Sequence, residues 1–311
     1  MIKLHNNLEE IPDDARGSVC VIGNFDGLHL GHQALLRQAA DIARIQNAPL
    51  SVLTFEPHPR EFFQPDTEPF RLTLLPAKQR ILGSLGVAHL FAAEFNAQLA
   101  ALTAEDFIEK VLKNQLGVRH VMVGRDFAFG RGRAGNVEQL RRIAGFGVTA
   151  IDPVTCDGEE TYSSTRVRGL LRAGKLDDAA ALLGRRWEID MPVVHGDKRG
   201  RELGYPTANQ QAGRYLRLPL GIYAVRVLIE GETVWREGVA NFGIRPMFRI
   251  TQPIFETYIF DFDSEIYGKN LRVQPVKFLR PEQEFKGLEA LSAQIKQDCH
   301  AAAAVLKSTS L

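Results

Sequence analysis

The chain has 311 residues, 45% of them hydrophobic and 24% charged, with a formal net charge of +1 at pH 7. These ordinary values exclude collagen-like, disordered and strongly charged classes, and the length predicts two domains. A nearly neutral chain has no overall field for coating nucleic acid or anionic lipid, so we expect neither nucleic acid nor a membrane as a partner.

The cysteines and the first residues favour a cytoplasmic protein. Cys20, Cys156 and Cys299 are far apart and include no CxxC pair, which argues against a disulfide framework and a zinc site. The opening residues are polar and acidic, unlike the apolar core of a signal peptide. No apolar run approaches the roughly 18 residues that a membrane span needs.

The first half of the chain alternates buried strands with amphipathic helices. Thr103 and Asp106 mark the capped start of one such helix. Continuous apolar runs predict strands at 18–23, 50–55, 120–124 and 148–154. This alternation predicts an α/β fold with a doubly wound parallel sheet, in which ligands bind at the carboxyl ends of the strands. The loops after these strands are therefore the candidate binding loops.

A helical connector and an all-β segment follow. Two short helices, broken at Gly174, are predicted over 166–184 and complete a first domain of residues 1–185. From about residue 187, long strands follow one another without a helix, which is typical of a small antiparallel β-barrel. One face of the strand 221–229 carries Tyr223, Val225, Val227 and Ile229. A helix from about Glu282 closes this second domain, residues 186–311.

The loop after the first strand has the features of a phosphate site. Its glycines allow sharp turns and a close approach to a ligand, and the next helix offers unpaired N–H groups. His29 and His32 share a helical face and can stabilise charge in a transition state, although either one alone would more readily be a polar cap. We assign nucleotide binding to the loop residues Gly23, Phe25, Asp26, Gly27 and Gly31.

Four ordered motifs resemble one family. GNFDGLHLGH is similar to the HxGH signature of the nucleotidylyltransferase superfamily. With three later motifs, it resembles the FMN adenylyltransferase half of the bacterial bifunctional riboflavin kinase/FAD synthetases, over about residues 1–185. The three later motifs are TFEPHP at 54–59, VGRDFAFGRGRAGN at 123–136 and SSTRVR at 163–168.

These motifs supply candidate flavin and phosphate contacts. Apolar, rigid side chains in the second motif suit a flat ring, or equally plain loop packing. Ser164 and Thr165 can bind phosphate, and Arg168 can neutralise charge developing on pyrophosphate. The basic tract 131–133 is expected to be a phosphate-contacting loop and not a nucleic-acid patch. Together with the resemblance, this favours flavin contacts at Phe55, Pro57, Pro59 and Asp126.

The second half contains another glycine-rich basic segment, GDKRGRELGYPTAN at 196–209. It lacks the spacing of a Walker loop but fits a backbone cradle for phosphates. In an extended stretch, Thr207 and Asn209 face one way and offer two neutral oxygens to Mg²⁺ shared with ATP. We assign nucleotide binding here to Gly196, Lys198, Gly200, Gly204, Thr207 and Asn209, the last two also as magnesium ligands.

This segment and the strands after it resemble the riboflavin kinase domain over about 187–305. Relatives usually carry Thr where this chain has Met247, which removes a hydroxyl. Glu256 shares a strand face with the apolar Ile254, Tyr258 and Phe260. By periodicity alone, Glu256 is equally an edge carboxylate facing water; the resemblance implies that it is the catalytic base, accepting a proton from a sugar-alcohol hydroxyl.

The sequence as a whole predicts a bifunctional enzyme with Mg²⁺ and ATP, whose flavins are substrate and product. Its second domain would phosphorylate riboflavin to FMN, and its first would join FMN to AMP from a second ATP, giving FAD and pyrophosphate. His29, His32, Arg168 and Glu256 are the predicted catalytic residues. One alternative is an HxGH nucleotidylyltransferase for another acceptor fused to a flavin-binding barrel, and another is a non-catalytic flavin-binding protein. The sequence carries no signal for the oligomeric state.

Overall fold

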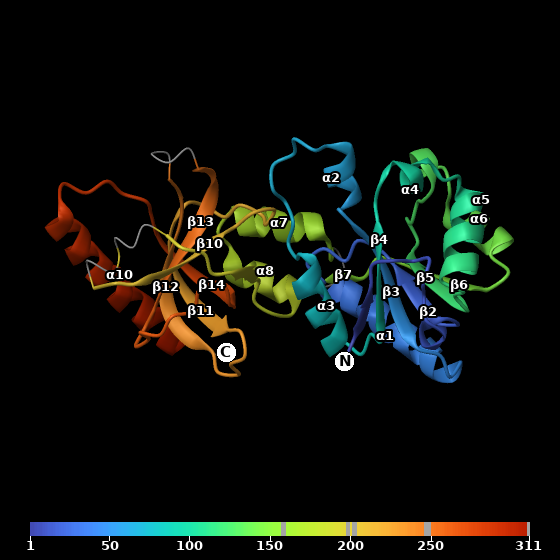
Figure 1. Cartoon of the computed structure of the whole chain (residues 1–311), viewed down its shortest axis with the longest axis horizontal. Coiled ribbons are helices and arrows are strands. Elements are labelled where there is room, and N and C mark those ends of the chain that lie inside the picture. The colour runs from blue at the N-terminus through green and yellow to red at the C-terminus, as the bar shows by residue number, and fades with distance from the viewer. Residues whose placement is uncertain (157–159, 197–199, 201–203, 246–249, 310–311) are drawn as a thin grey trace. The chain divides into compact units, whose positions relative to one another are not determined.

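The computed structural model describes residues 1–156, 160–196, 200, 204–245 and 250–309. The chain forms two compact units (Figure 1): Met1–Glu68 with Leu75–Ser163, and Pro69–Leu74 with Ser164–Leu311. The two helices after residue 163 thus group with the second unit by packing, whereas the sequence assigned them to the first domain. The functional boundary at 185 stays a prediction.

The first unit contains the predicted doubly wound parallel sheet, which is confirmed. Six strands pair in parallel in the order β1-β4-β3-β2-β5-β6. The connections run outward to both sides of β2, so the carboxyl end of β2 is the topological switch point where such sheets bind ligands. The strands are β1 (Lys3–His5), β2 (Val19–Ile22), β3 (Leu50–Glu56), β4 (His89–Glu94), β5 (His120–Gly124) and β6 (Gly147–Ile151).

Helices cover both faces of this sheet. The apolar stripes of α1 (Leu30–Ile45) and α3 (Leu75–Ser84) pack on one face. On the other face lie α6 (Val137–Ile143) and η2 (Phe107–Gln115), a helix with π-type hydrogen bonds. Thr103 Oγ1 accepts the N–H of Asp106 at 3.0 Å, as the capping pattern predicted. Smaller elements are η1 (Asp13–Ala15), α2 (Pro59–Phe63), α4 (Ala97–Ala101), α5 (Ala104–Asp106), η3 (Arg131–Arg133), β7 (Thr155–Cys156) and β8 (Glu160–Thr161).

The second unit begins with two helices and continues as a nearly closed barrel. The helices α7 (Ser164–Arg172) and α8 (Leu176–Leu183) meet at Gly174, whose φ of 69° suits glycine. Six antiparallel strands follow in the order β10-β13-β12-β11-β14-β9, and a bridge between Val194 and Asn209 joins the two edges. They are β9 (Ile189–Pro192), β10 (Thr207–Gln211), β11 (Gly221–Ile229), β12 (Arg236–Arg245), β13 (Ile250–Ile259) and β14 (Asn270–Pro281).

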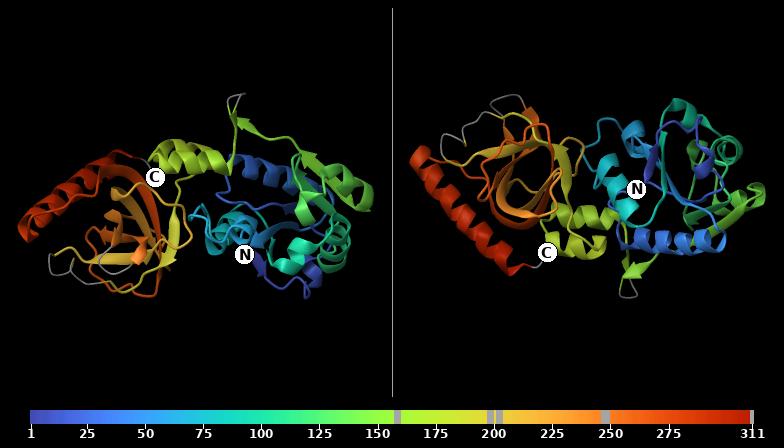
Figure 2. Two further views of the ribbon diagram at one scale, coloured as in Figure 1. Left: turned by 90° about the horizontal axis from the view of Figure 1, so that it is seen from above. Right: turned by 60° about the horizontal axis from the view of Figure 1, so that its bottom comes forward.

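The barrel wall is covered on its outside by α10 (Leu288–Ser308), as both views of Figure 2 show. The predicted face with Tyr223 and Val225 turns into the barrel, while Ala224 on the other face packs under Ala302 and Leu306 of α10. This helix begins six residues later than predicted, after Gly287 at a φ of 98°. Residues 282–287 instead form a loop, and three of them line the pocket described below.

Candidate functional site

The loop between β2 and α1 holds the two histidines in a fixed arrangement. His29 is the N-cap of α1, and its Nδ1 accepts the backbone N–H of His32 at 3.3 Å. The two imidazole rings stack with centroids 3.7 Å apart and planes 20° apart. Because Nδ1 of His29 accepts an N–H, the proton of the neutral ring lies on Nε2, where it can be donated to a phosphate oxygen.

The loop reaches this arrangement through left-handed backbone at Phe25 (φ 47°), Gly27 (φ 86°) and Leu28 (φ 48°). The side chains of Phe25 and Leu28 are buried beneath the loop, which compensates for the unfavourable conformation of two non-glycine residues. A Cβ at Gly31 would lie 3.0 Å from Cβ of Tyr162 and 3.1 Å from Nδ1 of His29, so a larger residue would press on the ring. The motif is therefore a tightly packed loop at the switch point.

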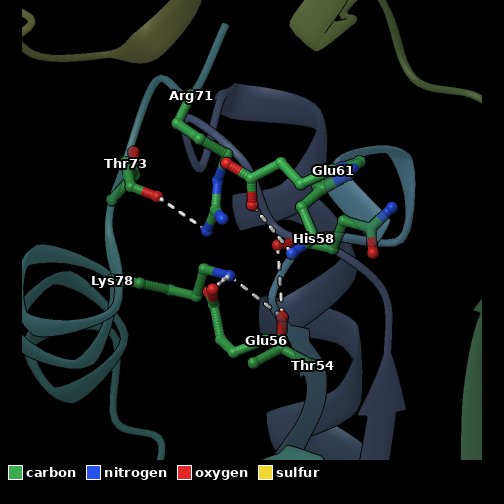
Figure 3. A network of polar contacts seen from close by, with 8 residues as sticks. Thr54, Glu56, His58, Glu61, Arg71, Thr73 and Lys78 are labelled. Atoms are coloured by element: carbon green, nitrogen blue, oxygen red, sulfur yellow. Dashed lines mark hydrogen bonds and ion pairs between the residues drawn. The ribbon is translucent and has the colours of Figure 1, made fainter. Parts of the chain in front are cut away.

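A buried lysine that the sequence analysis missed lies at the carboxyl end of β3 (Figure 3). Lys78 of α3 is 1% exposed, and its Nζ contacts Oε1 of Glu56 at 3.1 Å and Oγ1 of Thr54 at 3.0 Å. Both partners lie at the carboxyl end of β3. The signal was available, since Lys78 interrupts the apolar stripe of α3 formed by Ala77, Ile81 and Leu82.

The predicted flavin contacts surround the ends of β3 and β5. Phe55 is half-buried and meets Phe95 edge to face at 5.9 Å, while Pro59 starts α2 under the cap of His58. The Glu56–Pro57 peptide bond is cis. Asp126 is exposed two residues beyond β5. Contact of these residues with a flavin stays a prediction.

The predicted phosphate residues after 163 belong to the second unit. Ser164 and Thr165 are the first two residues of α7, and Thr165 is exposed. Arg168 donates its Nε–H to the carbonyl of Phe70 at 2.9 Å and lies over that residue's ring at 5.2 Å. The guanidinium is thus anchored by a backbone acceptor and an aromatic face.

A cavity of about 410 Å³ opens on the outer wall of the barrel, beside the first half of α10. Pairing across the strands places Glu256 of β13 opposite Asn209 of β10 on one side and opposite Asn241 of β12 on the other. All three line the cavity, together with Thr207. The structure therefore brings Glu256 together with Thr207 and Asn209, which lie 49 and 47 positions earlier in the chain. It also places Asn241, which the sequence analysis missed, in the same cavity.

The glycine-rich segment borders the same cavity. Gly196 and Gly200 line it, and a Cβ at either would come within 2.5 Å of a neighbouring atom, the amide nitrogen of Asn209 or the carbonyl oxygen of Tyr205. Gly204 has a φ of 83°. Lys198 and Met247 lie outside the described residues. The close approaches at Gly196 and Gly200 explain why this segment needs glycine.

An ion pair holds α10 as the far wall of the cavity. Arg280 of β14 donates to both oxygens of Asp298, at 2.8 and 2.6 Å, and the two side chains are only 16% and 8% exposed. Gln294 adds a third bond to Asp298 at 3.0 Å. Because Asp298 is a lone carboxylate on the buried side of α10, helical periodicity could have identified it.

Two features of the described residues bear on metals and membranes. Within the described ranges, no three His, Cys, Asp or Glu side chains gather as a group that could hold a metal ion. Among the helices described, none combines the length and hydropathy that crossing a bilayer requires.

Comparison with known proteins identifies the family. Sequence models match FAD synthetase over residues 11–166 and riboflavin kinase over residues 183–306. The bifunctional riboflavin kinase/FMN adenylyltransferase of Pseudomonas fluorescens is 42% identical and covers 98% of each chain, and that of Escherichia coli K12 is 40% identical, covering 96% of this chain and 95% of its own. A crystal structure from Streptococcus pneumoniae superposes on this chain with a TM-score of 0.82, at 31% identity over 99% of each chain. That neighbour is described as a macrolide-efflux protein. The chain belongs to the bifunctional riboflavin kinase/FMN adenylyltransferase family.

Proposed function

We propose that this chain phosphorylates riboflavin with ATP to give FMN and then adenylylates FMN with a second ATP to give FAD and pyrophosphate. The relatives that match nearly the whole chain are named for both activities, as bifunctional riboflavin kinase/FMN adenylyltransferases. The observation that carries the proposal is the cavity in which Glu256 stands between Asn209 and Asn241, with Thr207 beside them. We assign residues 1–185 to adenylyl transfer and residues 186–311 to the kinase reaction. We propose that the protein acts in the cytoplasm and that its partners are small molecules.

In the kinase cavity, Glu256 is the proton acceptor. Its carboxylate takes the proton of the ribityl 5′-hydroxyl as that oxygen attacks the γ-phosphorus of ATP and ADP leaves. Its place in the middle of a sheet matters, because strands on both sides fix its position. Gly196 and Gly200 line this cavity, so their backbone is the proposed phosphate cradle, with Gly204 further along the same segment.

The residues present fit a magnesium ion carried with ATP. Nδ2 of Asn209 donates to the carbonyl of Thr207 at 3.2 Å, which leaves Oδ1 of Asn209 as the acceptor oxygen of that amide. With the hydroxyl of Thr207, it offers the neutral oxygen ligands that Mg²⁺ accepts when phosphates supply the charge. When bound, the ion would neutralise phosphate charge, and Thr207 and Asn209 would hold it with the nucleotide beside Glu256.

In the adenylyltransferase half, FMN brings its own nucleophile. The FMN phosphate attacks the α-phosphorus of ATP and pyrophosphate leaves, so the site needs positioning and charge neutralisation instead of a strong base. His29 and His32 donate to the phosphates from their stacked rings, and Arg168 neutralises the leaving pyrophosphate. The remaining predicted contacts are Gly23, Phe25, Asp26, Gly27, Gly31, Ser164 and Thr165 for the nucleotide, and Phe55, Pro57, Pro59 and Asp126 for the flavin.

A time course with riboflavin, excess ATP and Mg²⁺, followed by chromatography, tests both activities. We expect FMN to rise first and FAD to follow. FMN accumulating without FAD would leave the kinase proposal standing and assign the HxGH half to another acceptor. Untouched riboflavin with folded protein would refute the kinase proposal, and FMN supplied with ATP would then test the other half alone.

A further inference from the structure

Near the loop between β2 and α1, which carries His29, Lys78 is a buried cation. The proposed mechanism gives it no role. Its ammonium group is enclosed at the carboxyl end of β3, between Glu56 and Thr54 (Figure 3). A buried ion pair is weak support for stability, because desolvation offsets much of the attraction between the charges. An apolar residue would continue the stripe of α3 at this position. The position of Lys78 therefore suggests a role beyond packing.

The contacts of Lys78 continue into the loop. Oγ1 of Thr54 accepts from Lys78 at 3.0 Å and donates to the carbonyl oxygen of Asn24 at 3.2 Å. A hydroxyl has one proton, so a cation on its lone pair directs that proton to Asn24 and strengthens the bond. The N–H of Gly23 is also bound, by the carbonyl of Leu53 at 3.1 Å. The start of the loop is thus tied to β3 by two adjacent bonds.

The next residue connects this tie to the histidines. Phe25 follows Asn24 with a left-handed φ of 47°, and its ring lies 5.1 Å from the ring of His32. His32 stacks in turn on His29 at 3.7 Å. A turn that is unfavourable for a non-glycine residue needs surrounding structure to hold it. The bond between Thr54 and Asn24 holds the residue immediately before that turn.

We propose that Lys78 is a positioning residue for adenylyl transfer, which acts through Thr54 and Asn24 to hold Phe25 and the stacked histidines in their active geometry. The inference rests on the proposed adenylyltransferase function. Loss of the tie would move the histidines relative to the charge that develops on the phosphates, and would leave most of the binding surface unchanged. The reaction step should therefore suffer more than substrate binding.

Two substitutions and two controls test this with the full-length protein. Lys78→Met removes the cation, and Thr54→Val removes only the hydroxyl while it keeps the ion pair with Glu56. Each should lower kcat for FAD formation from FMN by at least about tenfold, equivalent to about 1.4 kcal/mol, with KM values within about threefold. Thr54→Ser, which keeps the hydroxyl, should be close to wild type. Lys110→Met, at an exposed lysine paired with Asp106, is the matched surface control.

The double variant and an exchange measurement separate positioning from folding. If Lys78 acts through Thr54, Lys78→Met combined with Thr54→Val should be no slower than the worse single variant. Hydrogen exchange of the peptide 23–32 should rise in both single variants. Wild-type kcat in Thr54→Val, multiplicative losses in the double variant, or unchanged exchange of that peptide would overturn the proposal. If Lys78→Met does not fold, Thr54→Val alone decides.

The proposed function has its own control in the same experiment. Wild-type protein that makes no FAD from FMN refutes the adenylyltransferase function, whereas active wild type with equally active variants refutes only the role of Lys78. The exchange measurement does not depend on activity, so it tests the tie in either case. Riboflavin phosphorylation by each variant should match wild type, because the kinase residues lie in the other unit.

Discussion

Replacing Glu256 by Gln should abolish the kinase reaction and spare the rest of the molecule. The amide has nearly the shape of the carboxylate, and the backbone pairing with Asn209 and Asn241 is unaffected. What is lost is the proton acceptor, and a general base contributes about 10²- to 10⁴-fold, or about 3 to 5 kcal/mol of the barrier. Because Glu256 is only half-buried, we expect little change in stability.

The assay uses two reactions of one protein. Formation of FMN from riboflavin reports the altered cavity, and formation of FAD from supplied FMN reports the unaltered half in the same sample. Glu237→Gln is the matched control, since Glu237 is a half-buried carboxylate on the neighbouring β12 that does not line the cavity. Thermal unfolding of the three proteins at one pH checks that the fold is retained.

Two results would refute the reasoning. If Glu256→Gln kept a third or more of the wild-type kcat for riboflavin, Glu256 would not be the base. If both reactions fell together, the effect would be on the whole molecule and not on the cavity. A loss of the kinase reaction alone, with the control unchanged, is the only result that agrees with the proposed role of Glu256.

Three further outcomes are expected. Asp298→Ala leaves the buried guanidinium of Arg280 without its carboxylate, so the unit that carries α10 should lose about 3 kcal/mol of unfolding free energy in a denaturant titration, and wild-type stability would contradict this. Gly31→Ala places a Cβ 3.1 Å from the capping imidazole, so FAD formation should fall at least tenfold while FMN formation persists in the same assay. Burial lowers the pKa values of His5 and His89, whose rings are hydrogen-bonded at 3.1 Å; the folded state thus favours neutral rings, and stability is full above about pH 6.5 and is lost as pH falls below it. The thermal midpoint should therefore drop less between pH 8 and 5.5 in a His5→Gln, His89→Phe variant, and an equal drop would exclude these two histidines as the cause.

The sequence predicted the bounds of a strand well where the strand is a continuous run of buried apolar residues. The runs at 50–55, 120–124 and 221–229 became β3, β5 and β11 within one residue at either end. The start of α10 was placed too early because residues 282–287 are polar and compatible with a helix. Their loop conformation depends on the cavity that they border, which is a tertiary feature.

From residue patterns alone, the candidate site was predictable only where its residues lie close together along the chain, and the family resemblance was needed to select Glu256. The glycines and histidines of the HxGH loop form one continuous segment, and its spacing was enough to predict a phosphate site. Asn241 could not be found this way, because only the register between β12 and β13 places it beside Glu256. Lys78 carried a local signal as a charge within the apolar stripe of α3, but its partners could not be predicted, since they lie 22 and 24 residues earlier on another element.

By itself, the sequence of this protein determined the order of the main predicted elements, the two kinds of domain and the two candidate phosphate-binding loops. Those properties follow from the periodicity of apolar residues and from short-range motifs, which are local along the chain. The tertiary structure alone decided which face of the barrel wall carries the cavity, because α10 covers the outer face and buries Ala224 there. It also decided which charges are buried in pairs, such as Lys78 with Glu56 and Arg280 with Asp298, since burial depends on packing between distant segments.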